Sequence, residues 1–411
     1  MTVELLIEET PLCVRAARVE NDEVTALRHW FPGRETPILG ELYRARVMDH
    51  DRRLGAAFLE IGGGRKAFLR RPGRLPDIGS RLIVEVKKEE IGGKGADVTD
   101  KPVLRSAMAS WRVGEEDCRP GPLGERELPA DIRGALEDEG PVGRVDPFPP
   151  VCRLMLGLLT ADIERIGVTR PETKAAIEKE LPSGFPLEVV SPADTARFLD
   201  EAEEQALARQ HGLPGGGRLI IDETEALFTI DLDLGSQGGQ SKKGAGTKLL
   251  GDALSVLGRL APIMGLGGQI VIDIPRGAIA APKIVRDQIT RALKPLGRVS
   301  VPAVTPEGLS IVIAPRPRPS TLDVLTEEGS DAVIPGRRLR ADAAAACAMR
   351  AAERALEERR SDTVTLFITN RLRPCLDDDT QAMQVLKDRF GPRLTLSALA
   401  DHDPRGDFHV G

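Results

Sequence analysis

The sequence predicts a multidomain α/β protein with a small closed β-barrel near its N-terminus. Three observations support this prediction. The chain has 411 residues, more than a single hydrophobic core usually serves. Residues 38–105 hold five short apolar runs that are separated by glycine-rich turns. From residue 151 onward, strand-like and helix-like segments alternate, which is typical of α/β domains.

The N-terminal elements are short strands. Residues 3–30 alternate apolar and polar side chains and indicate a small meander. The five runs of the predicted barrel are Ile38–Met48, Gly55–Ile61, Lys66–Arg70, Arg81–Lys88 and Ala96–Thr99. Their lengths and turns indicate a barrel of the oligonucleotide-binding type. Residues 106–150 are rich in Gly, Pro and charge without periodicity, so we expect a linker or a reduced subdomain there.

The rest of the chain is expected to alternate between the two kinds of element. Strands are predicted at Arg165–Val168, Arg218–Ile221, Ala226–Leu232, Gln269–Ile274, Val299–Val304 and Gly308–Ala314. Helices are predicted at Arg153–Leu159, Pro171–Leu181, Pro192–Gln210, Thr247–Leu260 and Pro282–Leu296. Ser191 is the expected N-cap of the third helix and Gly212 its stop. A proline-rich linker at 315–320 precedes a last α/β unit with helices over 341–359 and 379–389.

Composition limits the classes of function. No apolar stretch is long enough to span a membrane, and the acidic N-terminus is unlike a secretory signal, so we expect a cytoplasmic protein. Five scattered cysteines without a CxxC pair predict neither disulfides nor a zinc site. The net charge is −6, yet residues 38–105 hold 15 Lys/Arg against 10 Asp/Glu, which is locally +5. Such a basic region attracts phosphate despite the acidic total, because salt screens distant charges.

Two phenylalanines stand out in this basic region because aromatic residues make up only 3% of the chain. Phe58 and Phe68 flank a glycine-rich turn, and Lys88 and Lys94 flank another. Aromatic rings on one face of a small barrel can stack with single-stranded bases, each worth about 1–3 kcal/mol, while lysines reach the phosphates. The alternative is that both phenylalanines are barrel core and both lysines are solvated turn charges.

Three aspartates lie at the ends of two apolar strands. Asp231 and Asp233 lie on the same face of the apolar strand segment Phe228–Leu234, because side chains repeat every two residues, and Asp273 lies near the end of the strand Gln269–Ile274. If a helix joins these strands as a parallel pair, the aspartates meet at one sheet edge. Paired carboxylates in an apolar setting favour a divalent cation, so we expect a Mg²⁺ site for phosphodiester hydrolysis. The alternative is that these residues cap turns or helices.

A loop of Gly, Ser, Gln and Lys at residues 235–246 follows the first of these strands directly. Its two lysines suit contact with phosphate. It lacks the GxxxxGK[ST] order of a nucleotide-binding P-loop, so no NTPase is predicted.

Several of these segments together resemble the catalytic part of the ribonuclease E/G endoribonucleases. Pro37-Ile-Leu-Gly-Glu-Leu-Tyr-Arg-Ala-Arg-Val47 and Val86-Lys-Lys-Glu-Glu-Ile-Gly-Gly-Lys-Gly95 are similar to that family's S1 domain. Leu213-Pro-Gly-Gly-Gly-Arg-Leu-Ile-Ile-Asp-Glu-Thr-Glu-Ala-Leu227 resembles the approach to its active site. Ile230-Asp-Leu-Asp and Leu266-Gly-Gly-Gln-Ile-Val-Ile-Asp273 resemble its two catalytic strands. The match runs through nearly the whole chain in the same order.

The resemblance implies an RNase H-like domain over residues 1–36 and 151–200, interrupted by an S1 barrel of the oligonucleotide-binding type at 37–105. Residues 106–150 would be a linker or a reduced sensor region. A DNase I-like α/β catalytic domain at 201–320 and a small C-terminal α/β domain at 321–411 would follow. By motif match, Asp231 and Asp273 hold the metal and Asp233 completes the catalytic group. Phe58, Phe68, Lys88 and Lys94 would contact RNA.

Three departures from the family pattern matter. Asp233 stands where the family usually has Asn, which adds a negative charge that Arg276 could offset. Residues 106–150 are too short for the family's sensor of 5′-monophosphate ends. The inter-domain CxxC that shares a zinc ion between two chains is missing from Thr321–Gly336, so a homo-oligomer stays open but without a zinc link.

The sequence therefore predicts a cytoplasmic, magnesium-dependent endoribonuclease that cleaves single-stranded RNA in RNA processing or decay. The competing hypothesis is an RNA-binding protein of the same fold with weak or no catalytic activity.

Overall fold

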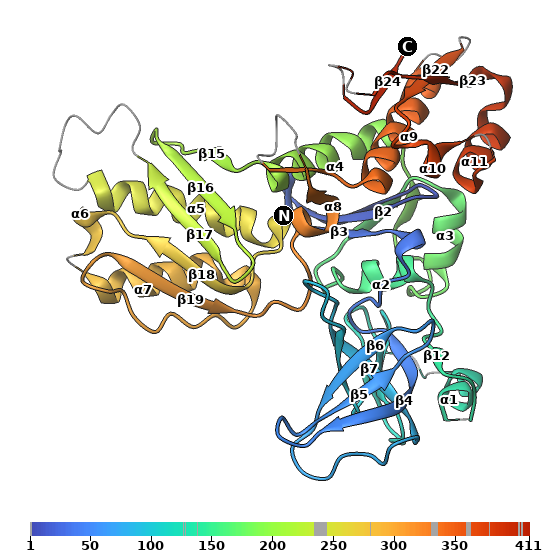
Figure 1. The fold of residues 1–411 in the computed structure, drawn as a ribbon, viewed down its shortest axis with the longest axis horizontal. Coiled ribbons are helices and arrows are strands. Elements are labelled where there is room, and N and C mark those ends of the chain that lie inside the picture. The colour runs from blue at the N-terminus through green and yellow to red at the C-terminus, as the bar shows by residue number, and fades with distance from the viewer. Residues whose placement is uncertain are drawn as a thin grey trace.

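The computed structural model describes residues 2–125, 127, 129–137, 139–233, 245–279, 281–329, 336–358, 363–377, 379–401, 403 and 406–411. Figure 1 shows a central region from which the barrel, the sheet β15–β19 and the C-terminal unit project in different directions. Mixed α/β architecture with a closed barrel is thus observed as predicted. None of the helices in the described ranges combines the length and apolar character that a bilayer-spanning segment requires.

The central sheet has five strands in the order β14-β13-β1-β2-β3. They are β1 (Val3–Glu9), β2 (Val14–Glu20), β3 (Glu23–Trp30), β13 (Arg165–Val168) and β14 (Leu187–Val189). The meander β1–β3 is antiparallel, and β13 pairs with β1 in parallel, so the sheet draws strands from both sides of the barrel segment. Asn21 and Asp22 have φ of 50° and 64°, as the two-residue hairpin between β2 and β3 requires.

Helices cover both faces of this sheet. The helices are α2 (Pro150–Leu156), α3 (Pro171–Glu178) and α4 (Pro192–Leu207). Val14 and Ala16 of β2 share a core with α2 and α3, whereas Ala17 shares a core with α4, because alternate side chains of a strand face opposite ways. The Ser191 hydroxyl accepts a hydrogen bond from the Asp194 backbone N–H at 3.1 Å, which confirms the predicted N-cap.

The barrel consists of five strands that close on themselves. They are β4 (Leu42–Asp51), β5 (Ala56–Glu60), β6 (Lys66–Arg70), β7 (Arg81–Lys88) and β8 (Ala96–Thr99). The strand order is β4-β5-β6-β8-β7, and an additional pairing of β4 with β7 closes the barrel. Its interior is filled by small and branched apolar side chains such as Ala57, Leu59 and Val84.

Residues 106–150 fold instead of forming an extended linker. β9 (Val103–Arg105), β10 (Ala109–Arg112) and β11 (Cys118–Pro120) make a three-stranded sheet, followed by α1 (Ala130–Glu137) and β12 (Gly143–Arg144), which pairs with β4. Trp111 of β10 is fully buried, and its indole N–H donates to the Glu115 carbonyl at 2.7 Å. The segment is therefore a small subdomain packed beside the barrel.

A second five-stranded sheet, which carries Asp231 and Asp273, has the order β15-β16-β17-β18-β19. Its strands are β15 (Gln210–Gly212), β16 (Arg218–Glu223), β17 (Phe228–Asp233), β18 (Gly268–Asp273) and β19 (Leu309–Ala314). Helices α5 (Ala245–Met264) and α7 (Pro282–Ala292) pack on one face. Their core also takes in Ala17 and Leu27 of the central sheet, so the two sheets share one hydrophobic core across α5.

One predicted strand is wrong. Val299–Val304 forms only isolated bridges to β19, through Ser300 and Val304. Pro302 lies between these two positions and has no backbone N–H to donate to a ladder, which explains why pairing stays discontinuous. The predicted helix Pro192–Gln210 also ends early, at Leu207, because residues 210–212 pair with β16 as strand β15.

The C-terminal unit is a small α/β layer. Helix α9 (Ala341–Glu358) and helix α11 (Gln381–Phe390) pack with β22 (Val364–Ile368), β23 (Leu394–Ala398) and β24 (Phe408–Val410). β22 is the middle strand, parallel to β23 and antiparallel to β24. Short helices α8 (Thr321–Leu325) and α10 (Arg373–Leu376) complete the unit.

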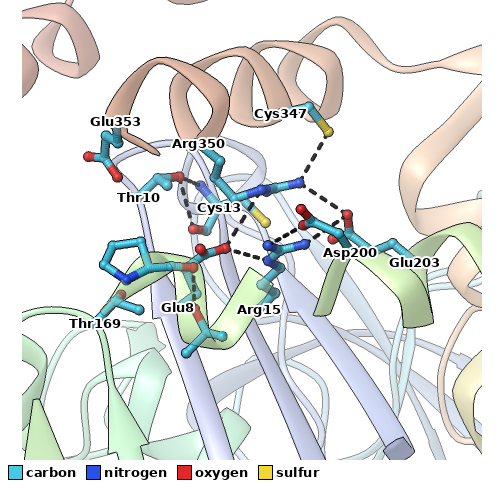
Figure 2. Close-up of polar contacts among 12 residues, drawn as sticks. Glu8, Thr10, Cys13, Arg15, Thr169, Asp200, Glu203, Cys347, Arg350 and Glu353 are labelled. Carbon is cyan, nitrogen blue, oxygen red and sulfur yellow. Dashed lines mark hydrogen bonds and ion pairs between the residues drawn. The ribbon is translucent and has the colours of Figure 1, made fainter. Parts of the chain in front are cut away.

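A buried ion-pair network joins this unit to the central sheet (Figure 2). The Arg15 side chain on β2 is 1% exposed and pairs with Glu8 at 2.5 Å, Asp200 at 2.5 Å and Glu203 at 3.0 Å. Arg350, from α9, pairs with Glu203 at 3.1 Å and Glu8 at 3.6 Å. The network therefore connects four elements, β1, β2, α4 and α9, and its two arginines share the carboxylate partners Glu8 and Glu203.

His29 makes this network sensitive to pH. Its Nε2 lies 2.7 Å from Glu203 Oε1, and burial lowers the pKa of His29 although Glu203 opposes that shift. A folded-state pKa below the unfolded value of about 6.5 means that the unfolded chain binds more protons below that pH. We expect the free energy of unfolding to fall from pH 7 to pH 5, by up to about 1.4 kcal/mol per pH unit from this residue. Urea titrations of wild type and His29→Gln check this: the variant should show a flatter pH dependence, and equal slopes would contradict it.

Candidate active site and nucleic-acid interface

The predicted aspartates lie on two neighbouring parallel strands. β17 and β18 pair in parallel with Ile230 opposite Ile272, so the next residues, Asp231 and Asp273, are neighbours in this register. The crossover between the strands is helix α5, as the sequence predicted. Figure 1 shows the carboxyl ends of both strands at the same edge of the sheet as the start of α5 and the short helix α6 (Arg276–Ile279). Carboxyl ends of parallel strands are where α/β sheets usually place ligands.

Both side chains are exposed, which corrects the expectation of carboxylates in an apolar, buried setting. Only alternate residues of these strands are buried: Phe228 and Ile230 in β17, with Ile270 and Ile272 in β18, face α5. The aspartates belong to the opposite face. They therefore pay no desolvation penalty and are accessible to a ligand from solvent.

Asp233 has a partner that the sequence did not suggest. Arg218, opposite it in β16, donates a hydrogen bond from its guanidinium to Asp233 Oδ2. The charge that distinguishes Asp233 from Asn is thus offset by Arg218, whereas the predicted compensation came from Arg276. Arg209, just before β15, binds Asp222 of β16 through two hydrogen bonds of 2.5 and 2.8 Å. These bonds raise the pKa of Arg209, and the negative charge of Asp231 adds to that shift.

The donor set fits a hard cation with few protein ligands. Among the described residues, no group of three or more His, Cys, Asp or Glu side chains is placed to hold a metal. Asp231 and Asp273 offer two carboxylates that are neighbours in the register of β17 and β18. Mg²⁺ usually keeps several waters and takes one or two carboxylates plus substrate phosphates, so two exposed aspartates suit it, whereas an all-protein calcium cage would need more oxygens.

Glu223, at the end of β16, contacts the linker at residues 315–320 and not the aspartates at the strand ends. Its Oε1 accepts from the Arg316 guanidinium at 2.5 Å, and its Oε2 accepts from the Ser320 hydroxyl at 2.5 Å. Burial raises the pKa of Glu223, while Ser320 and Arg316 lower it. The loop at 235–246, predicted to contact phosphate, falls mostly outside the described residues.

The predicted RNA-contact residues of the barrel lie in one cross-strand row. Phe58 of β5 pairs directly with Phe68 of β6, Phe68 with Asp97 of β8, and Asp97 with Lys88 of β7. Paired residues of neighbouring strands lie on the same face of a sheet. The ring centroids of Phe58 and Phe68 are 5.6 Å apart with an interplanar angle of 60°, and the Arg70 guanidinium lies 5.9 Å from the Phe68 ring.

This row faces away from the barrel core. Phe58 is 39% exposed, Phe68 is half-buried, and neither belongs to the buried barrel cluster. The alternative that both phenylalanines fill the barrel is therefore wrong. Asp97 in the same row was not singled out from the sequence, and its exposed carboxylate lies between the aromatic pair and Lys88.

Lys94 lies on the same part of the barrel, in an exposed turn. Ile91 bridges Lys94 across Gly92 and Gly93, whose φ values of 59° and 72° require glycine. Beyond the turn, a side chain at Gly95 would lie 2.4 Å from the Lys66 carbonyl. The glycines therefore set the shape of this turn, and the lysine side chain extends into solvent.

Phe58→Ala is expected to weaken binding of single-stranded RNA, because an exposed ring loses a stacked base worth about 1–3 kcal/mol, or roughly 5- to 150-fold in Kd. Phe58→Tyr keeps the ring face and should bind like wild type. Fluorescence anisotropy with a labelled oligonucleotide measures this effect. Equal affinity of the Ala and Tyr variants, with unchanged thermal unfolding, would contradict a stacking role.

Comparison with known proteins adds an independent finding. The model of the "Ribonuclease E/G family" matches residues 151–295, a range that includes both strands of the aspartate pair. Ribonuclease G of Escherichia coli (strain K12) is 26% identical over 351 aligned residues, which cover 66% of this chain and 71% of that protein. Ribonuclease G of Salmonella typhimurium (strain SL1344) is 24% identical over 408 residues, covering 80% and 83%. Ribonuclease E of Haemophilus influenzae is 24% identical over 384 residues, covering 75% of this chain and 41% of that protein.

The fold and these matches define a multidomain α/β protein with an oligonucleotide-binding-type barrel. The chain is similar to the ribonuclease E/G family: the family model matches residues 151–295, and the two relatives named Ribonuclease G align with it at 26% and 24% identity. The resemblance found in the sequence is thereby confirmed.

Proposed function

We propose that this protein is a magnesium-dependent endoribonuclease that cleaves single-stranded RNA in RNA processing or decay, in the cytoplasm. One observation carries the proposal: Asp231 and Asp273 are register neighbours on the exposed face of two parallel strands, at their carboxyl ends. Relatives named Ribonuclease G and Ribonuclease E support the reaction class.

The barrel supplies the contact with the strand in this proposal. Phe58 and Phe68 would stack bases, since sequence-tolerant recognition of single strands relies on ring faces. Lys88 and Lys94 would bind the backbone phosphates. The neighbouring carboxylate of Asp97 repels phosphate, so the bases rather than the backbone should lie over that part of the row.

At the catalytic sheet, Asp231 and Asp273 would hold Mg²⁺. When bound, the ion neutralises charge on the scissile phosphate and lowers the pKa of a water. Asp233, oriented by the hydrogen bond from Arg218, would position the attacking water. Arg218 also keeps the added negative charge of Asp233 from repelling the substrate phosphate.

A cleavage assay tests the proposal. Purified protein is incubated with an AU-rich single-stranded RNA oligonucleotide, with Mg²⁺ or with EDTA, and products are separated on a gel. Internal cleavage that requires Mg²⁺ is expected, and a matched DNA strand should compete poorly. RNA binding without cleavage under any of these conditions would instead favour the non-catalytic RNA-binding protein.

A further inference from the structure

A cavity of about 430 Å³ lies where the barrel, the central sheet and the linker after β19 meet. Its walls come from β3 and the turn after it, the start of the barrel, the β7–β8 turn, α2, and linker residues 318–324. In Figure 1 the chain that follows β19 passes the tip of the barrel at this junction. The volume falls within the range of small-molecule sites, and neither Asp231 nor Asp273 lines the cavity.

Arg28 and Arg318 line this cavity and have no carboxylate partner in the described part of the chain. One guanidinium nitrogen of Arg28 donates to the backbone carbonyls of Leu27 at 2.5 Å and Pro262 at 3.3 Å, and its Nε has no hydrogen-bond partner among the described residues. Arg318 forms no hydrogen bond or ion pair within the described ranges. Burial lowers the pKa of both groups, and the charge of Arg318 lowers that of Arg28 further.

One carboxylate in the described ranges is near enough to both arginines to affect them electrostatically, although it forms no ion pair with either. Glu89, on the barrel side, raises the pKa of Arg28 and of Arg318. Its own Oε1 accepts from the Leu39 backbone N–H at 3.0 Å, and burial raises its pKa. Of the other lining charges, Arg34 pairs with Asp342, and Asp323 pairs with Arg316 and Arg337, at N–O distances of 2.7, 3.4 and 3.2 Å. Arg153 pairs with Asp146 at 2.5 Å. Arg340 donates to the Asp323 backbone carbonyl at 3.5 Å, and Glu90 also lines the cavity.

Three guanidiniums without an ion pair in the described ranges, those of Arg28, Arg318 and Arg340, face the carboxylates of Glu89 and Glu90, which leaves an excess of positive charge. Arginine does not deprotonate in proteins, so its burial is unfavourable until an anion arrives. Guanidinium forks match phosphate oxygens in bidentate geometry. The remaining wall is apolar and aromatic, with Trp30, Phe31, Ile38, Leu39 and Leu154.

We propose that this junction cavity binds a nucleotide-sized phosphate monoester, with its phosphate on Arg28 and Arg318 and its ring against Trp30. The site is separate from the proposed nuclease chemistry and needs neither Mg²⁺ nor RNA. The backbone N–H of Glu89 already donates to the Pro317 carbonyl at 2.8 Å, so a ligand at this place would fasten the barrel to the linker.

The chain provides its own reporter for a test. Trp30 and Trp111 are the only tryptophans, and Trp111 is fully buried in the small subdomain, so Trp30 should dominate any fluorescence change at the cavity. The full chain is titrated in EDTA, without RNA, with AMP, ribose 5-phosphate, inorganic phosphate and adenosine. Isothermal calorimetry is the second readout. We expect AMP to bind with a submillimolar Kd, the two smaller phosphates more weakly, and adenosine not at all.

Arg318→Ala should weaken AMP binding about tenfold or more, because a bidentate charged contact is lost. It should leave folding intact, since Arg318 holds no other side chain. Glu89→Gln removes the competing carboxylate and should tighten binding. Arg291→Ala, on the exposed surface of α7, is the matched control and should bind like wild type.

Several results would overturn the site. They are absence of AMP binding at millimolar concentration, an unchanged Kd in Arg318→Ala, or the same loss in Arg291→Ala. Equal binding of ribose 5-phosphate and AMP would reject the contact with Trp30. None of these titrations measures RNA cleavage. A negative result for AMP binding would therefore leave the nuclease proposal unaffected, and a lack of nuclease activity would leave the proposed phosphate site unaffected.

Discussion

Asp273→Asn is expected to lower the rate of RNA cleavage by roughly 10³-fold or more, while RNA affinity stays within about twofold of wild type. The reason is that this carboxylate and that of Asp231 are register neighbours at the strand ends, and metal stabilisation of a reacting phosphate is worth several kcal/mol. The amide is nearly isosteric but carries no charge. Single-turnover cleavage and anisotropy binding, both with Mg²⁺ varied, measure the two quantities.

Asp287→Asn is the matched control for this substitution. Asp287 is also an exposed aspartate of the catalytic unit, but it lies on α7, which packs against the opposite face of the sheet. It should cleave at the wild-type rate. If the Asp273 variant keeps activity, or if both variants lose it equally, the aspartate pair is not the reaction centre.

Arg15→Met is expected to lower the free energy of unfolding by about 3–5 kcal/mol, because removing one member of a buried ionic group leaves the others uncompensated. Glu8 and Glu203 would remain inside the protein with Arg350 as their main counter-charge. Methionine has a similar length and preserves packing, so the loss measured would be electrostatic. Urea unfolding followed by far-UV circular dichroism at pH 7 gives the value.

Arg197→Met removes an ion pair of the opposite kind. Arg197 pairs with Asp22 at 3.6 Å, and both side chains are largely exposed. Such surface pairs contribute about 0–1 kcal/mol. A loss for Arg15→Met as small as that of Arg197→Met would show that the network in Figure 2 does not hold the C-terminal unit on the central sheet.

The strand–helix–strand unit around the aspartates was predictable because each segment has a clear period and clear ends. The predicted strands 226–232 and 269–274 are close to the observed β17 and β18, and the predicted helix 247–260 lies within α5. The expectation of buried carboxylates overlooked the alternation in the same strands. Phe228 and Ile230 of β17 are buried, whereas Thr229 and Asp231 between and after them lie on the other face. In β18, Gln269 and Asp273 lie on that face in the same way, which indicates a sheet covered on one side.

The ion-pair network could not be predicted for a different reason. Arg15 and Glu8 look like the polar half of an alternating strand, which normally faces solvent. Their partners come from α4 and from α9, far away along the chain, so no local spacing connects them. Arg218 escaped notice similarly, because its match with Asp233 depends on the register of β16 against β17.

For residues 106–150 the sequence left a linker and a reduced subdomain as alternatives, because the strands of the small subdomain at 103–144 are too short to show a period. Each has three or four residues, and β12 has two. The signal that was present is Trp111, one of two tryptophans in a chain with few aromatic residues. A large apolar side chain in an otherwise polar stretch indicates a place where something packs.

One side of helix α5 packs on the sheet β15–β19 and another side packs against β3, so both sheets contribute to one hydrophobic core. A gene fragment beginning at residue 201 would lack β2 and β3, and the side of α5 that they cover would be exposed to solvent. We expect such a fragment to be insoluble when expressed alone, and random mutations at Ala17 or Leu27 to reduce cleavage although both lie in a different sheet from the aspartates.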